Sequence, residues 1–392
     1  MRELSKLALV VGLNLSLVAC GGGGGSDSET TGSNSNNGGT PNSGNSGAQT
    51  NLTQEFGKWL TDMSTNHIET GYQSLLDESK TLSDGVASFC ANEAASKSDL
   101  KILQQQWTTS NQSWQAIQWL KVGPIIEESR NFRFQFWPDS NNAVEKGVDK
   151  LVARDETITA DYVSSQNVGA QGFPAIEKLL FNPEPANNLI NAENKNKQCE
   201  VLSAISLNVV NMSEEVVTAW SATGGNYRAT FIAGTGEFTG PVDVVEEVVT
   251  NWLEQLERVK DEKMLTPLGE NAPGLPHEAE SYISDTSLNN IKTNIDSLLA
   301  IYTASNGHGF DDILNNHLEQ TSIASQMLES LTRAQTKINE ISGSYDTALN
   351  SEESRARLEE VINALRDFRT VLSADFIQAM DINIGFNSND GD

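Results

Sequence analysis

Apolar residues recur at spacings of three and four along most of this 392-residue chain, and this period constrains the fold more than any other feature. Such spacing places apolar side chains on one face of a helix, and no stretch shows the sustained two-residue alternation of strands. The pattern predicts an all-α protein built from helical bundles. The apolar stripes cover residues 52–89, 100–117, 201–220, 244–259, 288–302, 310–341 and 358–377.

A glycine-containing break at Thr223–Asn226 divides these stripes into two groups. We therefore expect two bundles in tandem, an N-terminal one over residues 51–225 and a C-terminal one over residues 226–392. The chain carries 26 basic and 53 acidic residues, a formal net charge of -27. Because such a chain is repelled by phosphate backbones, we expect no nucleic-acid partner.

The N-terminus has the features of a lipoprotein signal peptide. Arg2 and Lys6 precede the mostly apolar segment Leu7–Val18, and a small residue then stands before Cys20. This pattern predicts a signal peptide over residues 1–19 and lipidation of Cys20. The alternative is a short uncleaved anchor with an incidental cysteine. Gly21 favours an outer-membrane location facing the periplasm of a bacterial cell.

A polar tract follows the lipidated cysteine. Residues 21–50 are rich in Gly, Ser, Asn and Thr, and they offer little apolar surface to bury. We expect residues 20–50 to form a disordered linker that lets a folded body float off the membrane.

Two cysteines remain in the body, Cys90 and Cys199. In an exported protein such a pair most simply forms one disulfide, which closes a long loop. Two free thiols or a pair of metal ligands are the alternatives.

The helical period fails over residues 121–142, where Gly123-Pro124 and Trp137-Pro138-Asp139 act as breakers. Arg130 and Arg133 lie in this segment beside aromatic residues. Long irregular segments in compact domains are often functional. Either the aromatics plug the end of a bundle while the arginines pair with surplus carboxylates, or the arginines orient carboxylates or accept an anionic chelate.

These residues carry a resemblance to the imelysin family, in particular to its periplasmic lipoproteins. The resemblance implies two all-α domains with a site in the cleft between them, and a role in bacterial iron acquisition or metal handling. The family also has a peptidase label. The matching pieces are Trp114-Gln115, Gly123-Pro124, Arg130–Phe134, Phe136–Asp139, Gly172–Glu177, Cys199-Glu200, Leu265–Gly269, Gly385–Asn387 and Asp390–Asp392.

The family's signature is Gly-x-His-x-x-Glu, in which His and Glu three residues apart lie on one helix face. Here Gly172 and Glu177 match, but Pro174 occupies the histidine position. Proline cannot ligate a metal, whereas it suits the first turn of a helix. Glu177 is therefore either a first-turn carboxylate favoured by the helix dipole or a ligand group of the cleft.

The histidines do not restore the missing motif. His67 lies on the first apolar stripe, where a hydrogen-bonded core histidine is the simpler interpretation, and it is the candidate imidazole for a metal beside Glu177. The sequence contains neither a His-Glu-x-x-His zinc motif nor a Gly-x-Ser-x-Gly nucleophile motif. We therefore expect a non-catalytic protein, although a peptidase of the imelysin type stays an alternative.

The sequence predicts one ligand-binding pocket lined by Glu177, Arg130, Arg133, Trp137 and Asp139, with His67 nearby. The expected function is capture of a metal, chelate or other small ligand by a membrane-tethered protein. The sequence does not identify a cofactor, and iron or another divalent metal is the candidate. The expected partners are the outer membrane, through the lipid anchor, and components of iron uptake, and we expect a monomer. A module that binds another envelope protein is a further alternative.

Overall fold

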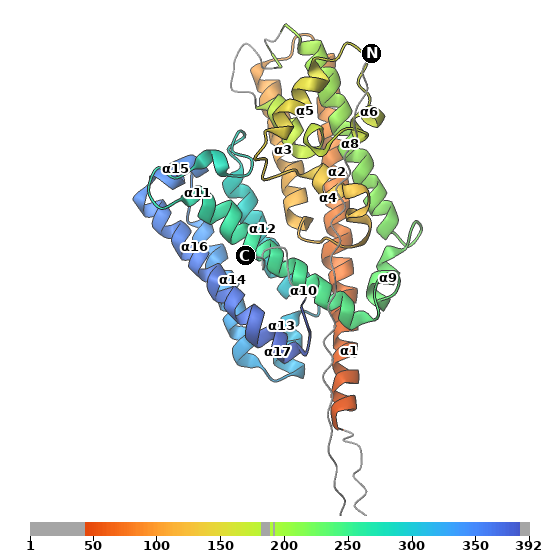
Figure 1. The fold of residues 1–392 in the computed structure, drawn as a ribbon, viewed down its shortest axis with the longest axis vertical. Coiled ribbons are helices and arrows are strands. Elements are labelled where there is room, and N and C mark those ends of the chain that lie inside the picture. Colours follow the sequence, from red (N-terminus) through yellow and green to blue (C-terminus); the bar gives the residue numbers. More distant parts are fainter. Residues whose placement is uncertain (1–43, 182–188, 191–192, 385–392) are drawn as a thin grey trace, which may run out of the picture. The chain divides into compact units, whose positions relative to one another are not determined.

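The computed structural model describes residues 44–181, 189–190 and 193–384, with side chains from residue 51 onward. Within these ranges every regular element is a helix, which confirms the all-α prediction (Figure 1). In the same part of the chain, no helix combines the length and the hydropathy needed to cross a membrane. The predicted signal peptide, Cys20 and the C-terminal motif pieces from Gly385 onward lie outside the described residues.

The first half of the body is built around three long helices. Helix α2 packs against both α3 and α8. Four buried tryptophans of this half, Trp59, Trp107, Trp114 and Trp220, come from the predicted stripes, whereas the buried Trp119 lies just beyond the stripe over residues 100–117. The elements are α1 (Gly44–Met63), η1 (Ser64–Ile68), α2 (Glu69–Ala91), α3 (Lys97–Ile117), η2 (Gly123–Ile125), η3 (Glu127–Ser129), α4 (Arg130–Phe134), α5 (Ala143–Val152), α6 (Ala160–Ser164), η4 (Val168–Ala170), α7 (Gly172–Leu180), α8 (Lys195–Trp220) and α9 (Tyr227–Ala233).

The second half has α14 at its centre, packed against α12 and α16. Its elements are α10 (Pro241–Glu257), η5 (Arg258–Leu265), α11 (Thr266–Leu268), η6 (Pro276–Glu278), α12 (Ser287–Tyr302), η7 (Ala304–Asn306), α13 (Phe310–Asp312), η8 (Ile313–His317), α14 (Thr321–Asn339), α15 (Tyr345–Asn350), α16 (Glu352–Val371), η9 (Leu372–Phe376) and α17 (Ile377–Met380).

Two helix boundaries differ from those that the apolar periodicity predicts. Helix α1 begins at Gly44, inside the segment expected as linker, because each residue added to an existing helix gains a backbone hydrogen bond without a new nucleation cost. The stripe over residues 310–341 is not one helix. It breaks between η8 and α14, where Glu319 has a positive φ of 55°.

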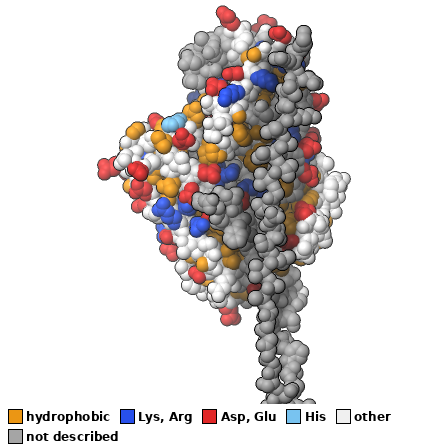
Figure 2. All heavy atoms as spheres, in the orientation of Figure 1, with side chains coloured by type: hydrophobic (Ala, Val, Ile, Leu, Met, Phe, Trp, Pro, Cys, Tyr) orange, Lys and Arg blue, Asp and Glu red, His pale blue; other side chains and the backbone are white. Residues whose placement is uncertain are grey.

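The described residues from Asn45 to Ile384 belong to one compact unit. Helix α12 of the second half packs against α3 of the first, so one continuous core links the two halves. The predicted domain boundary falls in the short connection between α8 and α9. The division at residues 225 and 226 stays a prediction. Figure 2 shows acidic side chains spread over the visible face, with lysines and arginines between them.

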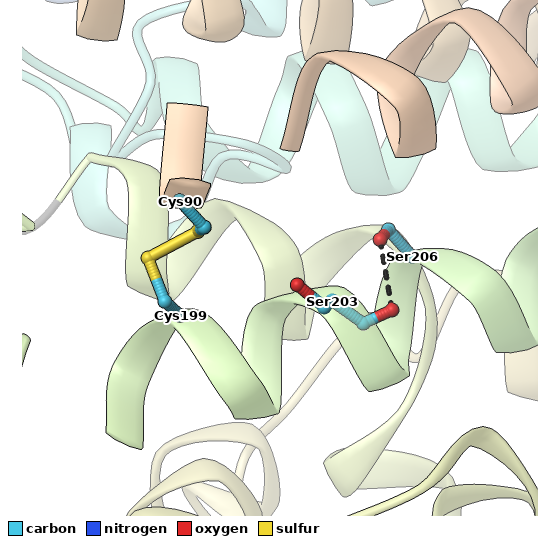
Figure 3. Close-up of a disulfide and its surroundings, with 4 residues drawn as sticks. All are labelled: Cys90, Cys199, Ser203 and Ser206. Carbon is cyan, nitrogen blue, oxygen red and sulfur yellow. Dashed lines mark hydrogen bonds between the residues drawn. A yellow bond between two sulfur atoms is a disulfide. The ribbon is translucent and has the colours of Figure 1, made fainter. Parts of the chain in front are cut away.

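The predicted disulfide is confirmed. Cys90, in the last turn of α2, is bonded to Cys199, in the first turns of α8, with the two Cα atoms 5.6 Å apart (Figure 3). Further along α8, the Ser206 hydroxyl donates to the Ser203 carbonyl oxygen, as Figure 3 also shows. The bond ties α2 to α8, two of the three long helices around which the first half is built.

Candidate functional site

The start of α7 requires a glycine. Gly172 has a φ of +71°, and a Cβ added there would lie 2.2 Å from the Arg133 carbonyl oxygen and 2.3 Å from that of Phe134. Any side chain would therefore clash with the backbone at the end of α4 and would also be strained. Pro174 follows in the first turn, where its missing N–H costs no helical hydrogen bond. The absence of a side chain at Gly172 thus lets the start of α7 pack directly against α4.

Glu177 is buried, with 6% of its surface exposed. It lies beyond the first turn of α7, so the expected first-turn position is wrong, because the helix already begins at Gly172. Its Oε1 accepts hydrogen bonds from the Ser284 backbone N–H, at 2.9 Å, and from the Ser284 hydroxyl, at 2.6 Å. Burial raises the pKa of Glu177 to about 7, although the bonds from Ser284 oppose this shift and the nearby charge of Glu280 adds to it.

A cavity of about 440 Å³ adjoins Glu177. Its wall comes from three segments, within residues 135–145, 174–178 and 277–283. Trp137 and Asp139, two further residues of the predicted pocket, also line it, and so does Pro174 at the motif's histidine position. The structure therefore brings Glu177, Trp137 and Asp139 together around one cavity.

Asp139 is held in place by the helix that follows it. Its two carboxylate oxygens accept hydrogen bonds from the backbone N–H groups of Ala143 and Val144, each at 2.8 Å. These N–H groups belong to the first turn of α5 and have no partner within the helix. The carboxylate thus satisfies two backbone N–H groups at the N-terminus of α5, and it contributes negative charge to the cavity wall.

Arg130 is not among the residues that line the cavity. Its Nε lies 2.9 Å from Glu215 Oε2, and its Nη1 donates to the Pro124 carbonyl oxygen at 2.9 Å. Glu127 pairs with the same guanidinium at 3.3 Å. Arg130 is therefore engaged by acidic side chains and a backbone carbonyl, and we assign it a structural role.

Arg133 is also absent from the cavity wall. Its Nε donates to Gln171 Oε1 at 3.0 Å, and its Nη1 lies 3.4 Å from Glu128. Gln171 Oε1 also accepts from the Asn208 side chain of α8. Arg133 therefore joins α4, the residue before α7, and α8. The prediction that both arginines line the cavity with Glu177 is not met, because local carboxylates and amides engage both.

His67 lies in the π-helical segment η1 and does not line the cavity. The Trp119 indole N–H donates to its Nε2 at 3.1 Å, and its Nδ1 lies 3.1 Å from the Ser305 hydroxyl. Burial lowers the pKa of His67 to about 4, so the ring is neutral at physiological pH. With Nε2 accepting from Trp119, this imidazole is a hydrogen-bonded structural group. The histidine that does line the cavity is His277.

A buried polar network adjoins the cavity, and sequence reasoning missed it. Lys263 is 1% exposed, and its Nζ lies 2.8 Å from Glu280 Oε2 and 2.8 Å from the side-chain oxygens of Gln115 and Asn294. Burial lowers the pKa of Lys263, which the Glu280 carboxylate opposes. Gln135, in the cavity wall, donates to Glu280 Oε1 at 3.0 Å.

Polar residues on an apolar helix face were the available signal for this network. Asn290 and Asn294, four residues apart, interrupt the apolar stripe of α12, and both side chains are buried and hydrogen-bonded. Polar groups are buried at such positions only when they find partners. The positions of Lys263 and Glu280 depend on tertiary packing, which spacing does not reveal.

The described part of the chain contains no preformed donor set for a resident metal. No group of three or more His, Cys, Asp or Glu side chains there is arranged to hold an ion. Pro174 in the cavity wall removes the imidazole that the family motif would supply there. The residues present do not fit a bare iron ion.

Comparisons with known proteins agree with this fold. An imelysin-like protein from Psychrobacter arcticum matches with a TM-score of 0.71 and 17% identity, over 85% of this chain and 98% of that one. A candidate iron-regulated protein A precursor from Parabacteroides distasonis matches with a TM-score of 0.66 and 16% identity, over 84% of this chain and 95% of that one. At these identities the two structures show the fold alone. No curated protein matches the chain. The imelysin family model, Peptidase_M75, matches residues 68–372, which is most of the chain, and the protein therefore belongs to the imelysin family.

Proposed function

We propose that this protein is an envelope lipoprotein that binds a small ligand or a metal chelate in the cavity beside Glu177, in the service of iron acquisition. The observation that carries the proposal is Glu177 itself. It is a buried carboxyl with a pKa raised to about 7, it matches the family motif, and it adjoins a cavity of about 440 Å³. Buried titratable groups in clefts mark functional sites more often than chance.

A chelate or an organic ligand suits the cavity better than a bare ion. A bare ion needs several oxygen or nitrogen ligands from the protein, and no such group of three is preformed among the described residues. A chelate brings its own donors to the metal, so the protein needs to supply only shape, charge and hydrogen bonds. The cavity offers all three.

The connection with iron rests on relatives. The family is the imelysin family, and one of the matching structures is of a candidate iron-regulated protein A precursor. We extend that connection to this chain as part of the proposal. Neither of the catalytic motifs sought above, for zinc or for a serine nucleophile, is present in the sequence to support the peptidase label of the family.

Anchoring at Cys20 is the second part of the proposal, and it rests on the lipobox pattern before that residue. Replacement by Cys20→Ser removes the acylated thiol and is expected to release the body from membranes. Fractionation followed by a salt wash measures this. Retention of the variant in the outer membrane after the wash would refute lipid anchoring and leave the ligand proposal unaffected.

Native mass spectrometry tests ligand binding on protein purified from iron-replete cells, combined with metal analysis of the same material. We expect an adduct on the wild-type protein, and we expect Glu177→Gln, which keeps the side-chain shape, to reduce it at least about ten-fold. Glu359→Gln, on the exposed face of α16, is the control and should keep the adduct.

Either of two results would reject the proposed function. One is the absence of any adduct, and the other is an adduct equally abundant in the Glu177→Gln variant. Hydrolysis of casein by a preparation that keeps this activity through repurification would instead favour the peptidase alternative.

A further inference from the structure

The charged residues of the cavity wall leave an excess of negative charge. Lys178 Nζ lies 2.9 Å from Glu145 Oε1, so these two charges offset each other. The carboxyl groups that remain in the wall are Asp139, Glu177 and Glu278, and Glu278 Oε1 lies 3.4 Å from His277 Nε2. A neutral imidazole there leaves the Glu278 charge uncompensated. The two arginines of α4 are engaged by Glu127, Glu128 and Glu215 and do not compensate the carboxylates of the wall. The charge of -27 over the whole chain adds to the negative potential.

Aromatic residues line the same cavity. Phe136 and Trp137 come from the segment before α5, and Tyr282 comes from the loop before α12. Tyr282 is 53% exposed although it is a large aromatic residue. The faces of aromatic rings carry negative electrostatic potential and attract ammonium and guanidinium groups.

Gln135 contributes an unpaired hydrogen-bond acceptor. Its Nε2 donates to Glu280 Oε1 at 3.0 Å, which leaves its own Oε1 buried and without a partner among the described residues. The opposite orientation of this amide would place two oxygens against each other, so the network fixes the assignment. A buried carbonyl oxygen without a donor is costly. Because this oxygen has almost no accessible surface, the side chains around it must shift before a ligand N–H can reach and satisfy it.

From these three features we infer that the cavity binds an organic cation, namely an alkylammonium or guanidinium group. The inference rests on the proposed function and specifies its ligand. The carboxylates supply opposite charge, the aromatic rings contact the cation, and Gln135 accepts one of its hydrogen bonds. A free amine, a chelate that carries such a group, and a Lys or Arg side chain of a peptide all present this chemistry.

The direct test compares two probes that differ in charge and little in shape. Nα-acetyl-arginine amide carries a guanidinium group, and Nα-acetyl-citrulline amide carries a neutral ureido group of similar size. Titration of the full body at pH 8, followed by NMR or calorimetry, should show the arginine probe binding at least about ten-fold tighter. The tripeptide Ala-Arg-Ala amide separates the sources. If it binds tighter than the single residue, a peptide carries the cation, and equal binding favours a free small molecule.

Variants of two exposed wall residues localise the probe. Tyr282→Leu removes a ring and Glu278→Gln removes a charge, and each should weaken binding of the arginine probe several-fold. Because both side chains are exposed, neither change threatens folding. Glu359→Gln also removes an exposed charge, outside the cavity, and should change nothing.

Equal binding of the two probes, no binding of the arginine probe, or binding unaffected by both wall variants would overturn the inference. A neutral or anionic ligand that mass spectrometry finds on the wild-type protein and not on Glu177→Gln would overturn the cation inference while the proposed function stands. Absence of every ligand would reject both.

Discussion

Glu177 combines two properties that act against each other. Its burial disfavours the charged carboxylate, whereas two hydrogen bonds from Ser284 favour it. Burial prevails, and the pKa of the group rises from 4.5 to about 7. Small changes near the cavity, such as the arrival of a cation, can therefore change the protonation of Glu177 at physiological pH. A surface glutamate would stay ionised throughout.

This raised pKa predicts how stability depends on pH. Between pH 4.5 and 7 the folded protein keeps the Glu177 proton and the unfolded chain loses it, so stability falls as pH rises through this window. The loss reaches about 3 kcal/mol above pH 7, at 1.36 kcal/mol per pKa unit. Glu177→Gln removes the titration and keeps an oxygen for Ser284. We expect the variant to be more stable than the wild type at pH 8 and nearly equal at pH 4.5.

Urea unfolding at pH 4.5, 6 and 8 measures this difference, with Glu359→Gln as the control for loss of an exposed carboxylate. A constant difference in unfolding free energy at all three pH values would show that Glu177 does not titrate in this window.

His67 has the opposite pH dependence. Its folded pKa is lowered to about 4, so as pH falls from 6.5 towards 4 the unfolded chain gains a proton that the folded protein does not accept. Stability should therefore decrease over this window, and His67→Gln should flatten the decrease. Thermal unfolding between pH 7 and 4 checks this. His277→Gln removes an exposed imidazole and is the matched control, and an equal effect of both variants would contradict the assignment.

At the scale of elements, the position of α7 depends on Gly172. Gly172→Ala should destabilise the protein by more than about 2 kcal/mol, since it adds left-handed strain to a clash with two carbonyl oxygens of α4. Gly57 in α1 is the matched control, because nothing lies within 4 Å of a Cβ there. Gly57→Ala should stabilise by about 0.5–1 kcal/mol. Denaturant midpoints measure both, and a neutral Gly172→Ala would show that α7 can shift away from α4.

The helices themselves could be predicted from spacing. The stripe of 201–220 corresponds to α8 and that of 288–302 to α12, because one buried face per helix leaves a period in the sequence. The cavity could be predicted in part. Trp137, Asp139 and Glu177 come from breaker and motif positions, and such positions mark where a chain leaves regular packing.

The partners of these residues could not be predicted from spacing. Ser284 and Glu177 are separated by more than a hundred residues, and only the packed chain shows that one hydrogen-bonds the other. Arg130 and Arg133 were expected in the pocket because the chain has few cations among many acids. The same excess of acids supplies Glu127, Glu128 and Glu215, which pair with the two arginines in the structure.

At the scale of the whole molecule, the disulfide encloses most of the cavity wall. The bond between Cys90 and Cys199 spans 109 positions, and two of the three wall segments, within residues 135–145 and 174–178, lie inside that loop. The third wall segment, within residues 277–283, lies outside the loop and reaches the others through the packing of α12 on α3. The covalent bond and the core therefore hold different walls of the same cavity.

Removal of the disulfide should lower stability without changing the cavity of the folded protein. The Cys90→Ser/Cys199→Ser double variant loses a cross-link that restricts the unfolded chain, which in the chain-entropy model costs about 4–5 kcal/mol for a loop of this length. Each single variant should lose as much as the double, because either one breaks the same bond. Chemical unfolding measures the loss, and binding of the arginine probe below the unfolding transition should stay at the wild-type value. A double variant as stable as the wild type would refute the restriction of the unfolded chain as a source of stability. A variant that is folded but binds the probe more weakly would show that the bond shapes the native cavity.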